Sequence, residues 1–97
     1  MTYEIYSTNA ACVLRFAGDV DMTDKGALER LEDELRAPCD IIVDVERLRY
    51  ADTTFLRFLV RLRAQIKSAR RGSVRLVGAN RNLRRVLDVT GLSALFR

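Results

Sequence analysis

The sequence has no histidine, no tryptophan, two cysteines and one proline in 97 residues. Without histidine, the protein lacks the side chain that most often transfers protons at neutral pH. Cys12 and Cys39 are too few for a disulfide framework or a zinc site, and we expect both to be reduced thiols. No glycine-rich phosphate loop and no nucleophile elbow occurs. We therefore predict that the protein is not an enzyme, has no catalytic or metal-binding residue and needs no cofactor.

Long apolar runs are also missing. No stretch approaches the ~20 consecutive apolar residues of a membrane-spanning helix. The first residues, MTYEIYSTNA, lack the basic start and apolar run of a signal peptide. We expect a cytoplasmic protein that does not associate with a membrane. The length fits one domain over residues 1–97, and it leaves the oligomeric state open.

Charge is distributed unevenly along the chain. Residues 1–46 carry four basic and eleven acidic side chains, whereas residues 47–97 carry thirteen basic and two acidic ones. Either the basic half presents a face to nucleic acid or to an acidic protein, or the two halves pack together and partly neutralise each other. A basic nucleic-acid-binding domain is an alternative, but we expect no direct nucleic-acid contact because no aromatic residues for base stacking are interleaved with the basic set. That set comprises Arg57, Arg61, Arg63, Lys67, Arg70, Arg71, Arg81, Arg84 and Arg85.

Hydrophobic periodicity predicts seven elements in the order ββαβαβα. Residues 3–7 are rich in β-forming side chains and alternate along the chain. In residues 12–17, Cys12, Leu14 and Phe16 alternate with Val13, Arg15 and Ala17, and this period of two is that of a strand. A turn at residues 8–10 joins them into an antiparallel hairpin that ends near Gly18. Strands that alternate with helices further along predict α/β layers around one sheet.

Three helices are predicted after the hairpin. The first is capped by Thr23 and ended by residues 37–38, and its apolar positions are Leu28, Leu31 and Leu35. The second and longest covers residues 52–70, with an apolar stripe at Phe55, Leu59, Leu62, Ile66 and Ala69. The third is capped by Asn80 and followed by Gly91, and its apolar positions are Leu83, Val86 and Leu87.

Two short strands separate these helices. Residues 41–45 are apolar and β-branched enough to be covered on both faces, which is typical of a central strand parallel to a neighbour. Residues 46–51 are expected to connect this strand to the longest helix. Residues 74–77 are expected to form the other strand. Three apolar residues near the end of the chain are expected to fold back onto the core: Leu92, Leu95 and Phe96.

An acid and two hydroxyls stand together where the longest helix begins, at Asp52, Thr53 and Thr54. In α/β sheets, functional groups gather at the carboxyl ends of strands. A hydroxyl there lies at the positive end of the helix dipole, where the charge of a phosphate is tolerated. From the residues alone, two interpretations stand: Asp52 or Thr53 simply caps the helix, or one hydroxyl is a phosphorylation site.

The chain resembles the STAS domain of bacterial anti-sigma factor antagonists. The family pattern has a hydrophobic strand ending in Asp, then Asp-Ser/Thr at a helix start, and later a strand leading to Val-Gly and a helix ending in Leu-x-x-Thr-Gly-Leu. The matching segments are FAGDVDMT (16–23), IIVDVERLRYADTTFLRFLV (41–60), VRLVGANRNLRRVLDVTGL (74–92) and LF (95–96). The resemblance implies a STAS-like mixed β-sheet with helices packed mainly on one side.

The resemblance also implies partner switching. An unphosphorylated domain of this family binds an anti-sigma factor with serine/threonine kinase activity and thereby releases a sigma factor. Phosphorylation breaks the complex, and a PP2C-type phosphatase restores it. By position the acceptor is Thr53, next to Asp52 and Thr54, and the chain is a substrate rather than an enzyme. The alternative is a STAS scaffold or interaction module whose threonine is never phosphorylated.

Phe55 departs from the family pattern, because many members carry a small residue there. It either lies on the buried stripe or covers the helix entrance and hinders a kinase.

A partner-binding surface is expected near the switch. Leu56 and Val60 lie one turn apart and off the main stripe, beside Arg63 and Lys67, and an exposed apolar pair with a basic rim suits a protein partner. The alternative is that the pair packs beneath the last helix. Three residues in the loop after another strand are also expected near the switch: Asp21, Met22 and Thr23.

Overall fold

The computed structural model describes residues 1–8, 11–35, 40–68 and 72–96. The predicted order of strands and helices is confirmed, with a short 3-10 helix added after the second strand and another near the end of the chain. The elements are β1 (Thr2–Ser7), β2 (Ala11–Val20), η1 (Met22–Asp24), α1 (Lys25–Glu34), β3 (Asp40–Ala51), α2 (Thr53–Ser68), β4 (Val74–Val77), α3 (Arg81–Val89) and η2 (Ser93–Phe96). None of the helices within these ranges combines the length and apolar character needed to cross a membrane.

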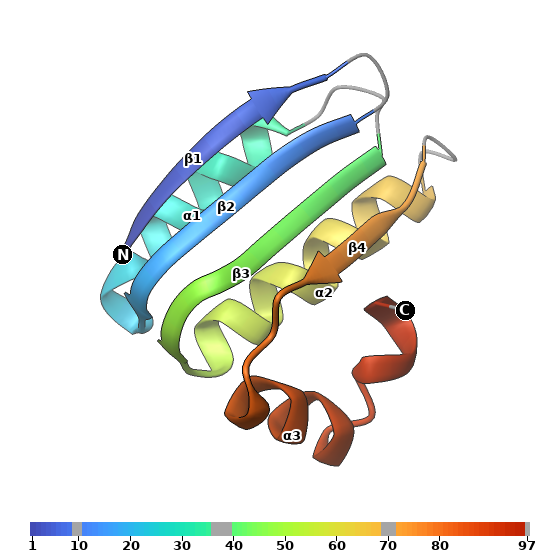
Figure 1. The fold of residues 1–97 in the computed structure, drawn as a ribbon. Coiled ribbons are helices and arrows are strands. Elements are labelled where there is room, and N and C mark those ends of the chain that lie inside the picture. The colour runs from blue at the N-terminus through green and yellow to red at the C-terminus, as the bar shows by residue number, and fades with distance from the viewer. Residues whose placement is uncertain (9–10, 36–39, 69–71, 97) are drawn as a thin grey trace.

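The four strands form one mixed sheet in the order β1-β2-β3-β4. β1 is antiparallel to β2, whereas β3 is parallel to both β2 and β4. Helices α1 and α2 cover one face of the sheet, and α3 lies beyond the end of β4 (Figure 1). The expected STAS-like arrangement is therefore confirmed, with β3 as the central parallel strand.

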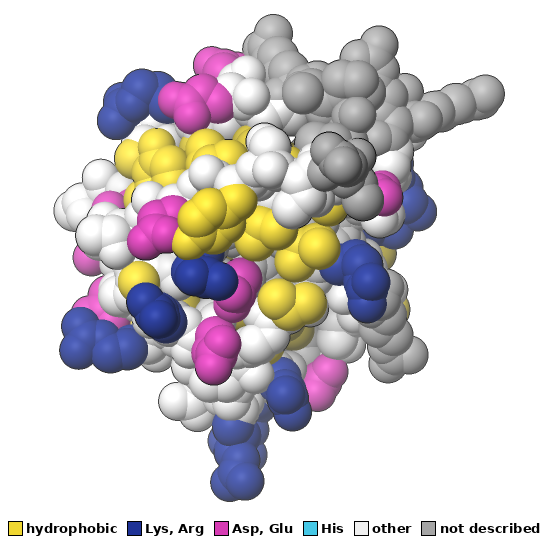
Figure 2. Space-filling model, turned by 45° about the horizontal axis from the view of Figure 1, so that its top comes forward, with side chains coloured by type: hydrophobic (Ala, Val, Ile, Leu, Met, Phe, Trp, Pro, Cys, Tyr) yellow, Lys and Arg dark blue, Asp and Glu magenta, His cyan; other side chains and the backbone are white. Residues whose placement is uncertain are grey.

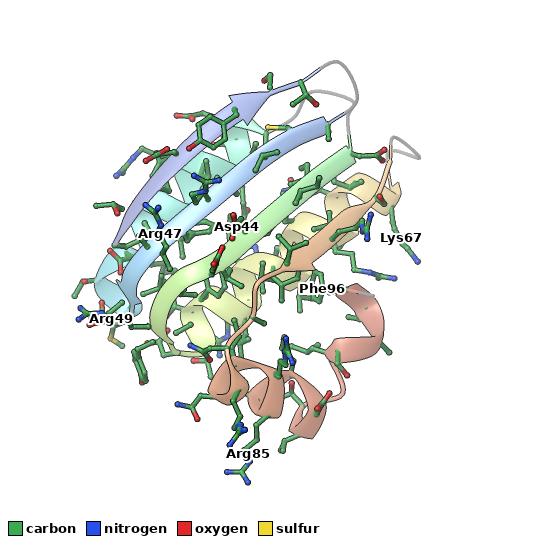
Figure 3. All side chains as sticks on the ribbon, in the orientation of Figure 1. Asp44, Arg47, Arg49, Lys67, Arg85 and Phe96 are labelled. Atoms are coloured by element: carbon green, nitrogen blue, oxygen red, sulfur yellow. The ribbon has the colours of Figure 1, made fainter. Side chains whose placement is uncertain are left out.

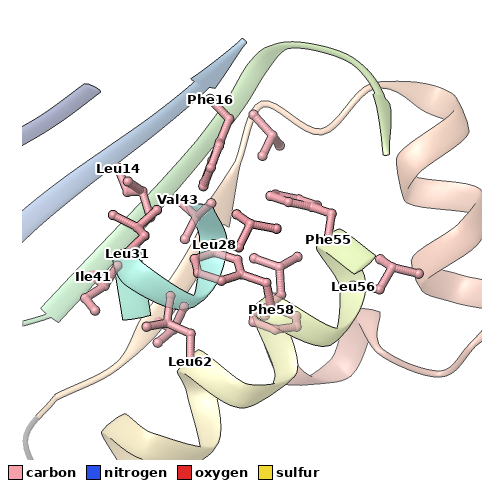
Figure 4. Packing of buried hydrophobic residues seen from close by; sticks show 14 of the residues in the cluster. Leu14, Phe16, Leu28, Leu31, Ile41, Val43, Phe55, Leu56, Phe58 and Leu62 are labelled. Atoms are coloured by element: carbon pink, nitrogen blue, oxygen red, sulfur yellow. The ribbon is translucent and has the colours of Figure 1, made fainter. Parts of the chain in front are cut away.

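Three phenylalanines hold the sheet to α2. The ring of Phe16 on β2 meets the rings of Phe55 and Phe58 edge-on, at centroid distances of 5.1 and 5.8 Å. Edge-to-face pairs add about 0.5–1.5 kcal/mol to the burial of the rings themselves. Aliphatic side chains from α1, α2 and the strands surround them and complete the core (Figure 4).

The central strand is longer than its sequence pattern predicts. A strand over residues 41–45 and a connection over residues 46–51 were expected, but β3 continues to Ala51. Val45 and Leu48 are both buried, with two exposed residues between them. The pairing with β2 shifts register at this point, as in a β-bulge. The bulge interrupts the alternation of period two, so the sequence of the second half of β3 does not show the pattern of a strand.

Helix and strand ends differ from the predicted ones at several points. The hairpin continues to Val20 rather than ending near Gly18, and Thr23 is not the cap of the first helix. Asp21 caps η1, and α1 follows from Lys25 with Asp24 at its N-cap, whose side chain makes no capping hydrogen bond. The cap at Asn80 is confirmed, since its side chain accepts a hydrogen bond of 2.8 Å from the amide of Leu83. Several predictions fall wholly or partly outside the described residues: the turn at residues 8–10, the helix ends at residues 37–38 and Arg70, the stripe position Ala69, and the state of Cys39.

Gly78 connects β4 to α3 at a place that has no room for a side chain. Its φ is +79°, and an added Cβ would lie 2.9 Å from the Cβ of Glu46 and 3.0 Å from its Cα. Gly91, just past α3, has a similar φ of +75° but nothing within 4 Å of an added Cβ. The two glycines therefore share a left-handed backbone and differ in the space beside it.

We predict that Gly78→Ala destabilises the protein more than Gly91→Ala does. Left-handed backbone costs about 1–2 kcal/mol at either position, and the contact with Glu46 adds about 1–3 kcal/mol at Gly78 alone. Urea unfolding followed by far-UV circular dichroism measures both losses. Equal losses for the two variants would contradict the close approach of Gly78 to β3.

Candidate functional site

Asp52 joins the ends of two strands to the start of α2. Its amide donates a hydrogen bond of 3.2 Å to the carbonyl of Val20, at the end of β2. Its carboxylate accepts a hydrogen bond of 2.8 Å from the amide of Thr54. Asp52 is therefore the helix cap, and of the two predicted cap residues Thr53 is excluded.

Thr53 is the first residue of α2, and its side chain is exposed. Its hydroxyl makes no hydrogen bond to any other residue in the described part of the chain. Thr54 is half-buried, and Phe55 is completely buried against Phe16 (Figure 4). Phe55 thus lies on the buried stripe and does not cover the helix entrance, which answers the question raised by its size.

A cavity of about 440 Å³ lies between α1 and the first half of α2. Asp52 and Thr53 line it, together with the cations Lys25, Arg57 and Arg61. Arg57 follows Thr53 by four residues, which places the two side chains on the same face of α2. The exposed hydroxyl therefore opens onto a cavity that positive side chains also line.

Glu32 is a buried carboxylate in the wall of this cavity. Burial raises its pKa, and the Arg61 guanidinium, 3.5 Å away, opposes that shift. Glu29 and Asp33 raise the pKa further by repulsion. A charged side chain is normally expected on the surface. The signal in the sequence for the burial of Glu32 is its position four residues after Leu28, on the apolar face of α1.

Of the three residues expected near the switch in the loop after β2, only Met22 lines the cavity with Thr53. Its side chain is 73% exposed. Asp21 and Thr23 serve the backbone instead: the Asp21 carboxylate accepts bonds of 2.9 Å from the amide and 2.5 Å from the hydroxyl of Thr23. These hydrogen bonds lower the pKa of Asp21. The side chains of Asp21 and Thr23 therefore stabilise the start of η1.

The predicted exposed pair on α2 is wrong for Leu56. That side chain is only 7% exposed and belongs to the core. Val60 is exposed, as expected. Arg63 is half-buried and donates a hydrogen bond of 2.9 Å to the carbonyl of Leu95, which ties α2 to η2. Lys67 is exposed, and the partner-binding roles of Val60 and Lys67 stay predictions.

The acidic and basic halves of the chain pack together. Arg49 pairs with Asp19 at 3.5 Å, and Arg61 pairs with Glu32 at the same distance. Figure 2 shows basic, acidic and apolar side chains interspersed over the face that it presents. Arg70 and Arg71 of the predicted basic set lie outside the described residues.

The described residues contain no group of three or more acidic, Cys or His side chains that could hold a metal ion.

Residues 4–97 match the family model described as "Mlab, STAS domain". The chain belongs to the STAS domain family. None of the curated proteins matches it. Among solved structures, this STAS domain is similar to the anti-sigma factor antagonist SpoIIAA in its unphosphorylated form. The TM-score is 0.79 and the identity 17%, over 99% of this chain and 86% of that one.

Two further solved structures have the same fold. An anti-sigma factor antagonist from Mycobacterium paratuberculosis has a TM-score of 0.80 and 19% identity, over 98% of this chain and 81% of that one. A sulfate transporter family protein from Wolinella succinogenes has a TM-score of 0.74 and 18% identity, over 93% and 75%. At such identities the likeness establishes the fold of this STAS domain, and its function must be argued from its own site.

We predict that Glu32→Gln stabilises the STAS domain more at pH 7 than at pH 4. A carboxyl whose pKa is raised in the folded state contributes most below its unfolded pKa, and that contribution is lost as the pH rises through the folded pKa. Glutamine cannot ionise, so the variant escapes this loss. Urea unfolding of both proteins at the two pH values measures the difference.

Glu34→Gln is the matched control for this experiment, because Glu34 is exposed on the same helix and is not among the groups that shift the pKa of Glu32. A gain that is equal at both pH values, or equal for Glu34→Gln, would show that burial of Glu32 is not the cause.

Proposed function

We propose that this STAS domain is an anti-sigma factor antagonist that switches partners through Thr53. Unphosphorylated, it binds an anti-sigma factor kinase and so releases a sigma factor; phosphorylated, it lets that kinase go. The observation that carries the proposal is the exposed hydroxyl of Thr53, held by the Asp52 cap at the start of α2. The fold of SpoIIAA, which has also been solved in a phosphorylated form from Bacillus, supports it.

The site suits a phosphate on physical grounds. Phosphorylation adds nearly two negative charges, which the amino-terminal end of a helix stabilises. Lys25 and Arg57 line the cavity that Thr53 faces and add positive charge there. The fold therefore tolerates the modification, while the new charge alters the surface that a partner meets.

The remaining parts of the switch belong to other proteins. The kinase partner supplies ATP and the catalytic groups, and a PP2C-type phosphatase removes the phosphate. The chain acts as ligand and substrate in the cytoplasm, where such kinases have their ATP. No catalytic residue is assigned to it.

A second candidate is a STAS interaction module whose threonine is never phosphorylated. The family description "Mlab, STAS domain" and the similarity to a sulfate transporter family protein favour this alternative, since neither refers to sigma factors. In such a module the same surface at the start of α2 would hold a fixed partner.

We predict phosphate transfer to residue 53 when the domain is incubated with ATP and anti-sigma factor kinases from the same genome. Mass spectrometry of the digested protein locates the phosphate. Thr53→Ala should abolish the labelling, whereas Thr54→Ala, which removes the neighbouring half-buried hydroxyl, should leave it intact. Absence of phosphate at Thr53 with every kinase that binds the domain would leave the interaction module as the function.

The affinity for the kinase distinguishes the effect of added charge at residue 53 from the effect of losing the hydroxyl. Thr53→Ala should bind about as tightly as the wild type because it adds no charge. Thr53→Glu should bind about tenfold more weakly or worse, because like charges brought together at an interface cost several kcal/mol. Titration calorimetry measures both affinities, and equal affinities would place Thr53 outside the contact.

A further inference from the structure

A groove of about 310 Å³ runs between the last residues of β3 and helix α3. Its lining is mainly apolar, and two of the lining residues, Leu48 and Leu83, are buried members of the core. The groove is separate from the cavity that Thr53 lines, which lies between α1 and α2. None of the residues predicted for the switch or for its partner-binding surface lines it.

Asn80 fixes the two walls of this groove to each other. Its side-chain amide donates a hydrogen bond of 3.1 Å to the carbonyl of Leu48, and its side-chain oxygen accepts one of 2.8 Å from the amide of Leu83. One residue therefore caps α3 and anchors it to β3. A groove that is formed before binding avoids part of the ordering cost of association.

Apolar side chains stand exposed at the groove. Tyr50 is 59% exposed on the β3 side, and Val86 is 37% exposed on the α3 side. Val89, one turn beyond Val86, is 81% exposed and extends the apolar strip along α3. Tyrosine is enriched among the residues that anchor protein interfaces, because its large ring loses little conformational freedom.

The charge beside these side chains is positive. Arg49 comes from β3 and Arg85 from α3 (Figure 3), so each wall of the groove includes an arginine. No Asp or Glu is among the described residues that line the groove. Arg49 pairs with Asp19 at 3.5 Å, but both side chains are largely exposed, and such a pair contributes little. Both arginines can therefore donate hydrogen bonds to a carboxylate of a bound molecule.

We propose that this groove binds an acidic segment of a protein partner, which inserts one apolar side chain between Tyr50 and Val86 and pairs its carboxylates with Arg49 and Arg85. The inference deepens the proposed function and rests on it for the link to the switch. Ala51 lines the groove and is two residues from Thr53 in sequence. A phosphate at Thr53 would place negative charge near an acidic segment seated there and weaken its binding.

Selection of random peptides displayed on phage tests the groove without any kinase. The unphosphorylated wild-type chain is the target, and the selected peptides are then titrated against purified variants. We expect peptides rich in Asp and Glu around a Leu, Ile or Phe. Arg85→Glu and Tyr50→Ala should each weaken them by about tenfold or more, which corresponds to about 1.4 kcal/mol.

Arg75→Glu is the matched control for charge reversal. Arg75 is exposed on β4, where it is paired in register with Ile42 near the start of β3, at the end of the sheet away from the groove. It should leave peptide affinity unchanged. Thermal unfolding midpoints close to that of the wild type show that each variant is folded, as expected for exposed positions.

Three results would overturn the proposal. The first is a selection that yields no binding peptides or peptides without acidic residues. The second is an equal loss for Arg75→Glu and Arg85→Glu. The third is binding of a fluorescent single-stranded DNA that depends on Arg85 when no peptide binds, which would assign the groove to nucleic acid. If acidic peptides bind the groove but no kinase phosphorylates Thr53, only the proposed switch is contradicted. If Thr53 is phosphorylated but no peptide depends on the groove residues, only the proposed groove is contradicted.

Discussion

The contact between Phe55 and Phe16 fixes how α2 lies on the sheet. Phe55 is completely buried, with its ring edge-on to that of Phe16 at a centroid distance of 5.1 Å. Residues two apart on an α-helix are separated by about 200° around its axis. Burying Phe55 therefore turns Thr53 outward, away from the core. Phe55, whose size suggested that it could hinder access to Thr53, is therefore the residue whose burial exposes Thr53.

Most of the fold follows from periodicity in the sequence, and the errors have local causes. Alternation identified the hairpin, and the spacing of leucines identified α1. The second half of β3 was missed because residues 46 and 47 are both exposed at a bulge, which breaks the period of two. The cap of η1 was missed because Asp21 and Thr23 are both good capping residues. Only the direction of their hydrogen bonds decides between them.

The site was less predictable than the fold because it depends on contacts between distant segments. Leu56 lies off the main stripe of α2, yet it is buried because the core extends around that helix beyond the face turned to the sheet. The β3–α3 groove depends on the hydrogen bond between Asn80 and Leu48, which are far apart in sequence. A helical pattern shows one apolar face, and it does not show which neighbours cover the others.

Thr53 stands close in sequence to two surfaces that are lined by different cations. It lines the cavity that holds Lys25 and Arg57, and Ala51, two residues earlier, lines the groove that holds Arg49 and Arg85. Arg61 contributes less to the first surface because it already pairs with Glu32. The Asp52 cap and the buried Phe55 hold the backbone on either side of Thr53. The proposed switch requires that charge added to this hydroxyl act on what binds the surface while the helix beneath it stays in place, and the two contacts on either side of Thr53 meet that requirement.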